Sequence, residues 1–238
     1  MPIDLKELVA SRMGENYRLH EQFVNSTLVK VQRTIGFDKV YANAEGAYLH
    51  DMDGAVYLDF LSGYSVFNIG RNHPVVKQAL LDALEMDLPN MVQMDCSLLS
   101  GLLAEALVKR TPAHLDAVFF CNSGAEAIEG ALKFARAATG RAGVASVDGA
   151  FHGLSYGALS AMGIENFREG FAPFRPEFQR VPFGDMDALE KLLSTRAIGA
   201  FVVEAFPFAG YERLKSRCDF GHNVLLSLWY IARLVPKK

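Results

Sequence analysis

The pattern of hydrophobic and polar positions changes near residue 74. Before it, alternating segments flank Asp53–Gly54, a pair typical of two-residue turns, and this pattern predicts a small antiparallel β-hairpin. After it, apolar residues recur every three or four positions in residues 74–86 and 97–110. This spacing predicts two amphipathic helices, the second of which Ser97 can cap.

From residue 117 onward, short apolar runs alternate with helical patterns. The alternation predicts an α/β fold in which a mostly parallel sheet has helices on both faces. Asp185 can cap the last of these helices, and Glu129 and Lys133, four residues apart on an earlier one, suit an ion pair. The predicted strands are residues 117–121, 143–147, 178–183 and 198–206, and the predicted helices are 124–139 and 186–196.

By pattern the chain has three parts: an N-terminal segment with the hairpin (1–73), the α/β alternation (74–204) and a basic tail (205–238). From residue 211 onward the tail carries a charge of +4, although the whole chain has a net charge of −3. Within it, residues 223–235 predict one amphipathic helix, which is too short to span a bilayer.

Composition narrows the classes of partner. The 238-residue chain has a pI of about 6.1 and no cluster of Lys and Arg interleaved with aromatic residues, so we expect neither nucleic acid nor an anionic membrane as partner. The charged N-terminal segment lacks the apolar core of a signal peptide. Three widely spaced cysteines do not suggest a disulfide framework, and the histidines lack metal-ligand spacing. We therefore expect a cytoplasmic protein without a metal site.

The join between the strand at 117–121 and the helix after it carries small residues, Gly124 and Ala125, behind Ser123. Ser123 and Glu126 form a capping-box pattern, so one interpretation is that Ser123 only caps its helix. The other interpretation is an anion site, because free N–H groups and the helix dipole meet at a helix N-terminus beside the end of a parallel strand. Neither a dinucleotide fingerprint nor a Walker A motif is present there.

Two further signals follow along the chain. Phe151 and His152 come after a short strand, where the ring of Phe151 could lie against a heteroaromatic ring or simply fill the core. Glu204 stands at the end of an otherwise apolar strand. A carboxylate there needs a partner, which is either structural or a ligand.

Together these motifs resemble class III aminotransferases, which are pyridoxal-phosphate (PLP) enzymes of fold type I. The resemblance covers roughly residues 35–204 and rests on "NSGAEAIEGALKFARAATG", "FHGLSYGALSAMG" and "FVVE", with an earlier segment similar to the family pattern "DG-x-x-YLDF-x-SG". It implies reversible amino transfer between an amine or amino acid and an oxo acid. It also implies a homodimer whose subunits share the active-site rim, at residues 62–64.

The resemblance also implies which residues meet the cofactor. The phosphate would bind at the helix N-terminus, the pyridine ring would stack on an aromatic side chain with a histidine beside it, and a carboxylate would lie near cofactor and substrate. Ser123, Gly124 and Ala125 would bind the phosphate. Phe151 would stack on the ring with His152 beside it, and Glu204 would be the carboxylate. The resemblance assigns no catalytic residue.

After Glu204 the sequence departs from the family pattern. The family places downstream an aspartate that pairs with the pyridinium nitrogen and a lysine that joins PLP covalently. The candidates here, none in the family's sequence context, are Asp219, Lys215, Lys237 and Lys238. We therefore expect an incomplete fold in which the strand at 200–203 keeps an exposed edge.

Three hypotheses follow from this departure. The favoured one is a truncated or frame-shifted class III aminotransferase with little activity of its own. The second is a non-catalytic remnant that binds a partner or regulates a full-length paralogue. The third, a complete small enzyme of another class, leaves the matches at residues 151–153 and at Glu204 unexplained.

Overall fold

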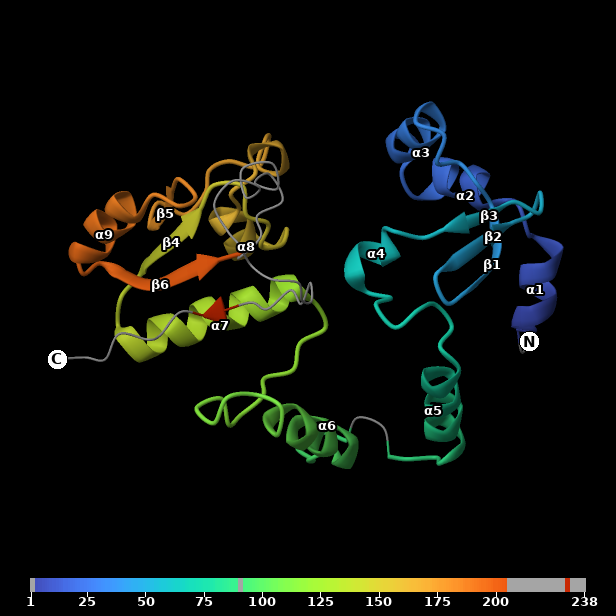
Figure 1. The fold of residues 1–238 in the computed structure, drawn as a ribbon, viewed down its shortest axis with the longest axis horizontal. Coiled ribbons are helices and arrows are strands. Elements are labelled where there is room, and N and C mark those ends of the chain that lie inside the picture. Colours follow the sequence, from blue (N-terminus) through green and yellow to red (C-terminus); the bar gives the residue numbers. More distant parts are fainter. Residues whose placement is uncertain (1–2, 90–91, 205–229, 232–238) are drawn as a thin grey trace. The chain divides into compact units, whose positions relative to one another are not determined.

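The computed structural model describes residues 3–89, 92–204 and a two-residue strand at 230–231. It divides into two compact units, Met1–Asp95 and Cys96–Lys238, which are described separately (Figure 1).

The first unit combines short helices with a small antiparallel sheet. Its helices are α1 (Leu5–Ser11), α2 (Asn16–Phe23), α3 (Ser26–Thr34), α4 (Ser62–Ser65) and α5 (Pro74–Glu85), and its strands are β1 (Tyr41–Glu45), β2 (Tyr48–Asp51) and β3 (Val56–Leu58). The strand order is β1-β2-β3, and both pairs are antiparallel. The predicted hairpin is therefore confirmed, and one more strand extends it.

Asp51 fixes the turn of this hairpin. Its carboxylate accepts hydrogen bonds from the N–H groups of Asp53 and Ala55, at 3.0 and 2.8 Å, and from the hydroxyl of Tyr57 at 2.7 Å. Gly54 supplies the positive φ of 84° that the turn requires. These bonds hold the pKa of Asp51 below its ordinary value, and the Tyr57 hydroxyl is the largest cause.

The segment at 62–64 lies in α4, whose backbone is unusual. Ser62, Gly63, Tyr64 and Ser65 all have positive φ, between 50° and 69°. Such a left-handed turn is costly for residues other than glycine. Asp59 supports it by accepting the Ser62 N–H at 2.9 Å, while its other oxygen pairs with Arg71 at 2.8 Å.

The second unit is a three-layer α/β arrangement. Its helices are α6 (Leu98–Val108), α7 (Gly124–Thr139), α8 (Tyr156–Ala161), η1 (Glu165–Phe167) and α9 (Met186–Ser194), and its strands are β4 (Gly143–Val147), β5 (Phe178–Val181), β6 (Ile198–Val203) and β7 (Tyr230–Ile231). The strand order is β5-β4-β6-β7. The first three strands are parallel, as predicted, and β7 joins β6 antiparallel.

Helices cover both faces of this sheet. On one face, Ile128 and Leu132 of α7 and Ala158 of α8 pack with Val144 of β4. On the other, Val147 and Val181 pack against the apolar side of α9. Asp185 caps α9 as predicted, accepting the N–H of Ala188 at 2.9 Å.

Three predictions about strands and helices need correction. Residues 117–121 form no strand, because nothing in the described part of the chain supplies a hydrogen-bonded neighbour for them. The outer edge of β6 is not exposed along its whole length, because Val202 and Val203 pair with β7. A helix over 223–235 is wrong at residues 230–231, which are strand, and its other residues lie outside the described part.

Candidate functional site

The first turn of α7 is built by a capping box. Ser123 is extended, with φ −149° and ψ 161°, and its Oγ accepts the Glu126 N–H at 3.2 Å. Glu126 in turn reaches back, and its Oε2 accepts the Asn122 N–H at 2.7 Å. The predicted box is therefore confirmed, although its return bond ends one residue earlier than the usual one.

The capping box leaves two donors of this turn available. The first N–H groups of an α-helix have no acceptor inside the helix. Those of Gly124 and Ala125 have no acceptor among the residues that the structure describes. A Cβ placed on Gly124 would meet nothing within 4 Å, so no described side chain crowds this residue. We call Ser123, Gly124 and Ala125 the helix cradle.

The body of α7 fixes where the helix cradle lies. Ile128, Leu132 and Ala135 are buried, as their spacing predicts, and Gly140 ends the helix in the left-handed conformation (φ 67°). α7 runs back along the sheet and begins on the side at which the parallel strands end (Figure 1). This is the edge where open α/β sheets place their ligands.

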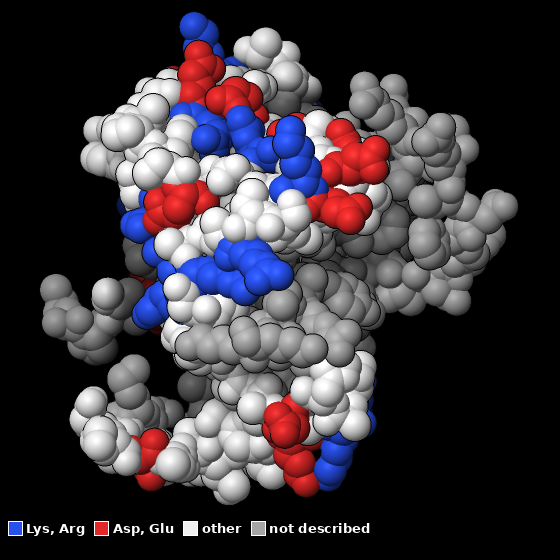
Figure 2. All heavy atoms as spheres, turned by 90° about the vertical axis from the view of Figure 1, so that its left-hand side faces the viewer, with Lys and Arg blue, Asp and Glu red and all other residues white. Residues whose placement is uncertain are grey.

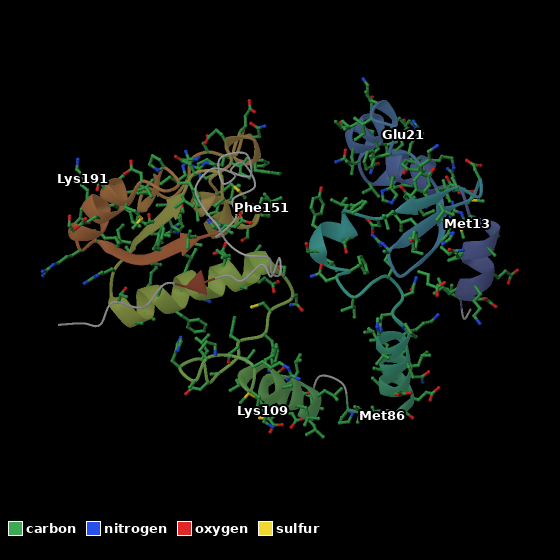
Figure 3. The ribbon with its side chains drawn as sticks, viewed as in Figure 1. Met13, Glu21, Met86, Lys109, Phe151 and Lys191 are labelled. Carbon is green, nitrogen blue, oxygen red and sulfur yellow. The ribbon has the colours of Figure 1, made fainter. Side chains whose placement is uncertain are left out.

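Residues 151–153 form a loop after β4 that touches the helix cradle. Gly153 has φ 114°, and a Cβ there would lie 2.6 Å from the Cβ of Ala125. The loop backbone therefore packs directly on the first turn of α7. We call these three residues the aromatic loop; Figure 3 shows the side chain of Phe151 in it.

Phe151 and Glu204 meet through the backbone. The N–H of Phe151 donates to Oε2 of Glu204 at 2.9 Å, so Glu204 holds the aromatic loop at the end of β6. Burial raises the pKa of Glu204, and the Phe151 N–H opposes this rise. The ring of Phe151 is partly buried and lies edge-on to Phe167, with centroids 5.3 Å apart.

His152 is 1% exposed. Burial lowers the pKa of its imidazole to about 4. The side chain is therefore neutral at pH 7, and it brings hydrogen-bonding capacity to the loop without a charge.

The predicted residues thus gather at one edge of the second unit. Ser123, Gly124 and Ala125 form the first turn of α7, Phe151 and His152 lie in the loop packed on that turn, and Glu204 bonds to the loop. Contacts made through Ala125–Gly153 and Phe151–Glu204 connect all three elements.

Sequence reasoning missed Glu129. The expected ion pair with Lys133 does not form; Oε1 of Glu129 instead accepts from the Ser155 hydroxyl and the N–H groups of Gly157 and Ala158, at 2.7, 2.7 and 3.1 Å. No local sequence signal marks this role, because the three donors lie 26 to 29 residues away along the chain.

Several charged side chains elsewhere in this unit form ion pairs. Arg136 of α7 and Arg175 both bond to Oε1 of Glu177, at 2.7 and 2.5 Å. These bonds and the residue's own backbone N–H, which is the largest cause, lower the pKa of Glu177 to about 2. Figure 2 shows basic and acidic side chains interspersed on the side that is turned to the viewer.

Two kinds of feature are absent from the described residues. No group of three or more His, Cys, Asp and Glu side chains there could hold a metal ion. None of the helices in that part of the chain has the length and apolar character needed to cross a membrane.

Comparison of the sequence with known proteins shows which protein family the chain matches. The family model for "Aminotransferase class-III" matches residues 31–210. The chain is 38% identical over 186 residues to aminotransferase PigE of a Serratia species, and 39% identical over 173 residues to acetylornithine aminotransferase of Bacillus cereus. These matches cover 78% and 73% of this chain but 22% and 43% of the relatives, so the chain spans less than half of either protein.

A solved structure agrees with the family match. Taurine:2-oxoglutarate aminotransferase from Bifidobacterium kashiwanohense, in complex with PLP and glutamate, matches with a TM-score of 0.66 and 26% identity. The match covers 86% of this chain and 49% of that one. The match confirms the predicted fold type I for this chain, with a parallel sheet between helices. PLP is the cofactor of the family. The chain belongs to the class III aminotransferases.

Proposed function

We propose that this chain forms the PLP phosphate-binding part of a class III aminotransferase, which transfers an amino group between an amine or amino acid and an oxo acid. The observation that carries the proposal is the meeting of the helix cradle, the aromatic loop and Glu204 at one edge of the sheet. The family match over residues 31–210 supports it.

The helix cradle fits a phosphate group. The N–H groups of Gly124 and Ala125, which have no acceptor among the described residues, lie at the positive end of a 16-residue helix, and a Cβ on Gly124 would meet nothing within 4 Å. The hydroxyl of Ser123 accepts from Glu126, which leaves its own hydrogen available to donate to an anion.

The remaining site residues would hold and orient the ring of the cofactor. PLP, when bound, supplies an electron sink for bond cleavage next to the substrate nitrogen. Phe151 would stack on the ring, His152 would lie beside it as a neutral side chain, and Glu204 would fix the loop that carries both. Protein groups thus supply binding and orientation.

The rate of amino transfer depends on a lysine that joins PLP covalently. No lysine of the chain stands in the sequence context of the family's PLP-linked lysine; Lys215, Lys237 and Lys238 lie outside the described residues. We therefore expect this chain alone to bind PLP and to transfer amino groups only slowly. We further propose that the protein is a cytoplasmic homodimer. Its small-molecule partners would be an amino donor and an oxo acid.

Glycine substitutions test the proposed cofactor site. Gly124→Ala would place a methyl group in the open space of the helix cradle without meeting a protein atom. We expect the dissociation constant for PLP, followed by fluorescence titration, to rise at least about tenfold. Gly101→Ala on α6 is the matched control, because its Cβ also meets nothing within 4 Å. Equal PLP affinity in both variants and the parent chain would refute the site.

Borohydride reduction tests the proposal about turnover. Reduction makes any PLP–lysine link permanent, and peptide mass mapping then locates the modified lysine. We expect no stoichiometric label at one position. Stoichiometric labelling of a single lysine, for example Lys215, would overturn the expectation of slow turnover.

A further inference from the structure

The short helix α8 begins three residues after the aromatic loop. Residues 157–161 are all buried, and Ser155, the residue before α8, makes no side-chain capping bond. Its first N–H groups therefore need an acceptor from elsewhere in the fold. The acceptor is Glu129 of α7.

Glu129 provides one oxygen for three donors. Its Oε1 accepts from the Ser155 hydroxyl at 2.7 Å and from the N–H groups of Gly157 and Ala158 at 2.7 and 3.1 Å. A Cβ at Gly157 would clash with Oε2 of Glu129, so the carboxylate would have to shift if residue 157 carried a side chain. A charged acceptor makes such bonds stronger than a neutral one.

The other end of α8 is held by a second charged side chain. Nη1 of Arg168 donates to the carbonyl oxygens of Leu159, Ser160 and Met162, at 3.0, 3.1 and 3.3 Å. Its guanidinium also lies 3.9 Å from the ring centroid of Phe174. α8 is therefore held at both ends by charged side chains, and Glu129 ties its start to α7 in addition to the apolar packing of Ala158 against that helix.

Ala125 and Glu129 lie on the same side of α7, one helical turn apart. Ala125 touches Gly153 of the aromatic loop, and Glu129 binds the start of α8 two residues further on. The helix that offers its N-terminus to the phosphate thus also fixes the position of the loop that carries Phe151 and His152.

We propose that Glu129 is a positioning residue, which sets the aromatic loop against the helix cradle so that phosphate and ring of the cofactor are held together. This inference rests on the proposed PLP site. It separates two parts of binding: the phosphate needs the helix cradle alone, whereas the whole cofactor also needs the aromatic loop in place.

The test compares PLP with inorganic phosphate on the full chain. Variants are Glu129→Ala, Glu129→Gln, which keeps an acceptor oxygen but loses the charge, and Ser155→Ala, which removes one of the three donors. Glu190→Gln is the matched control, because Glu190 lies on the exposed side of α9. Readouts are the affinity for each ligand and the circular dichroism that the site induces in the PLP absorption band.

For Glu129→Ala we expect PLP affinity to fall about tenfold and the induced dichroism to be lost, while phosphate affinity changes less than about twofold. Glu129→Gln should restore part of both PLP signals, and Ser155→Ala should lower PLP affinity by a smaller factor. If Glu129→Ala does not fold, the Gln and Ser155 variants decide. Unchanged PLP affinity, or an equal loss for both ligands, would overturn the positioning role.

The same measurements distinguish this inference from the proposed function. If PLP binding depends on Gly124 but not on Glu129, only the positioning role fails. If the parent chain does not bind PLP, or binds it independently of Gly124, both fail.

Discussion

At the scale of single residues, the site combines two ionisable groups that burial drives toward their neutral forms. Burial lowers the pKa of His152 to about 4 and raises the pKa of Glu204. Both effects disfavour a charge beside the aromatic loop. Because one pKa is lowered and the other raised, a fall in pH weakens the stabilisation that depends on neutral His152, whereas a rise in pH weakens the one that depends on neutral Glu204.

His152 should make the fold sensitive to acid. Its pKa is about 4 when folded and 6.5 when unfolded, so the unfolded chain binds more protons between these values. The stabilisation is fully present above pH 6.5 and is lost as pH falls toward 4. By pH 4.5 we expect His152 to have cost about 2 to 3 kcal/mol of the free energy of unfolding.

Urea unfolding at pH 7 and pH 4.5 measures this effect. His152→Gln, which cannot be protonated, should lose less stability over that interval than the parent chain. Glu204 acts in both proteins and cancels in the comparison. Equal losses in the two proteins would show that His152 does not titrate as its burial implies.

Residue types alone predicted the helix cradle better than its surroundings. Ser123, Gly124 and Glu126 act within a few residues of one another, so local rules are sufficient to predict the capping box. Glu129 interacts with residues 26 to 29 positions away. The spacing along the helix predicted an ion pair with Lys133. Only the packing of α8 on α7 shows that Glu129 instead accepts hydrogen bonds from the start of α8.

At the scale of elements, patterns identified helices and strands where each could form independently of distant segments. The helices at 74–86, 97–110, 124–139 and 186–196 were found with nearly correct ends. The apolar run at 117–121 was not a strand, because a strand also requires a neighbour, and the run itself does not show whether one exists.

Contact between the aromatic loop and α7 should depend on the missing side chain at Gly153. Gly153→Ala would combine an unfavourable φ of 114° with a Cβ 2.6 Å from that of Ala125. We expect a loss of about 2 to 3 kcal/mol in the free energy of unfolding, and weaker PLP binding, because the loop must move away from the helix.

Gly184→Ala is the control for this experiment. Gly184 also has positive φ, 82°, but its Cβ would meet nothing within 4 Å. It should show the backbone cost alone, about 1 kcal/mol, with PLP affinity unchanged. If both variants lose the same stability and bind PLP equally, close packing between Gly153 and Ala125 is not important.

At the scale of the whole molecule, much apolar surface is left exposed. On α6, the leucines at 98, 99, 102, 103 and 107 are all between 40% and 73% exposed. Monomeric soluble proteins rarely expose large contiguous apolar patches. The sequence predicted α6 as an amphipathic helix, but in the structure its leucines contribute little to the buried core.

This exposed surface should bind the dye ANS in the folded protein. Leu102 and Leu103 are each about half exposed, so changing both to Gln should lower the ANS fluorescence while changing the free energy of unfolding by less than about 1 kcal/mol. Leu132→Gln is the contrasting variant, because Leu132 is 5% exposed within the core and should cost several kcal/mol. If the parent chain shows no ANS fluorescence, or the α6 double variant is as unstable as Leu132→Gln, then α6 is covered in solution and its leucines belong to a core.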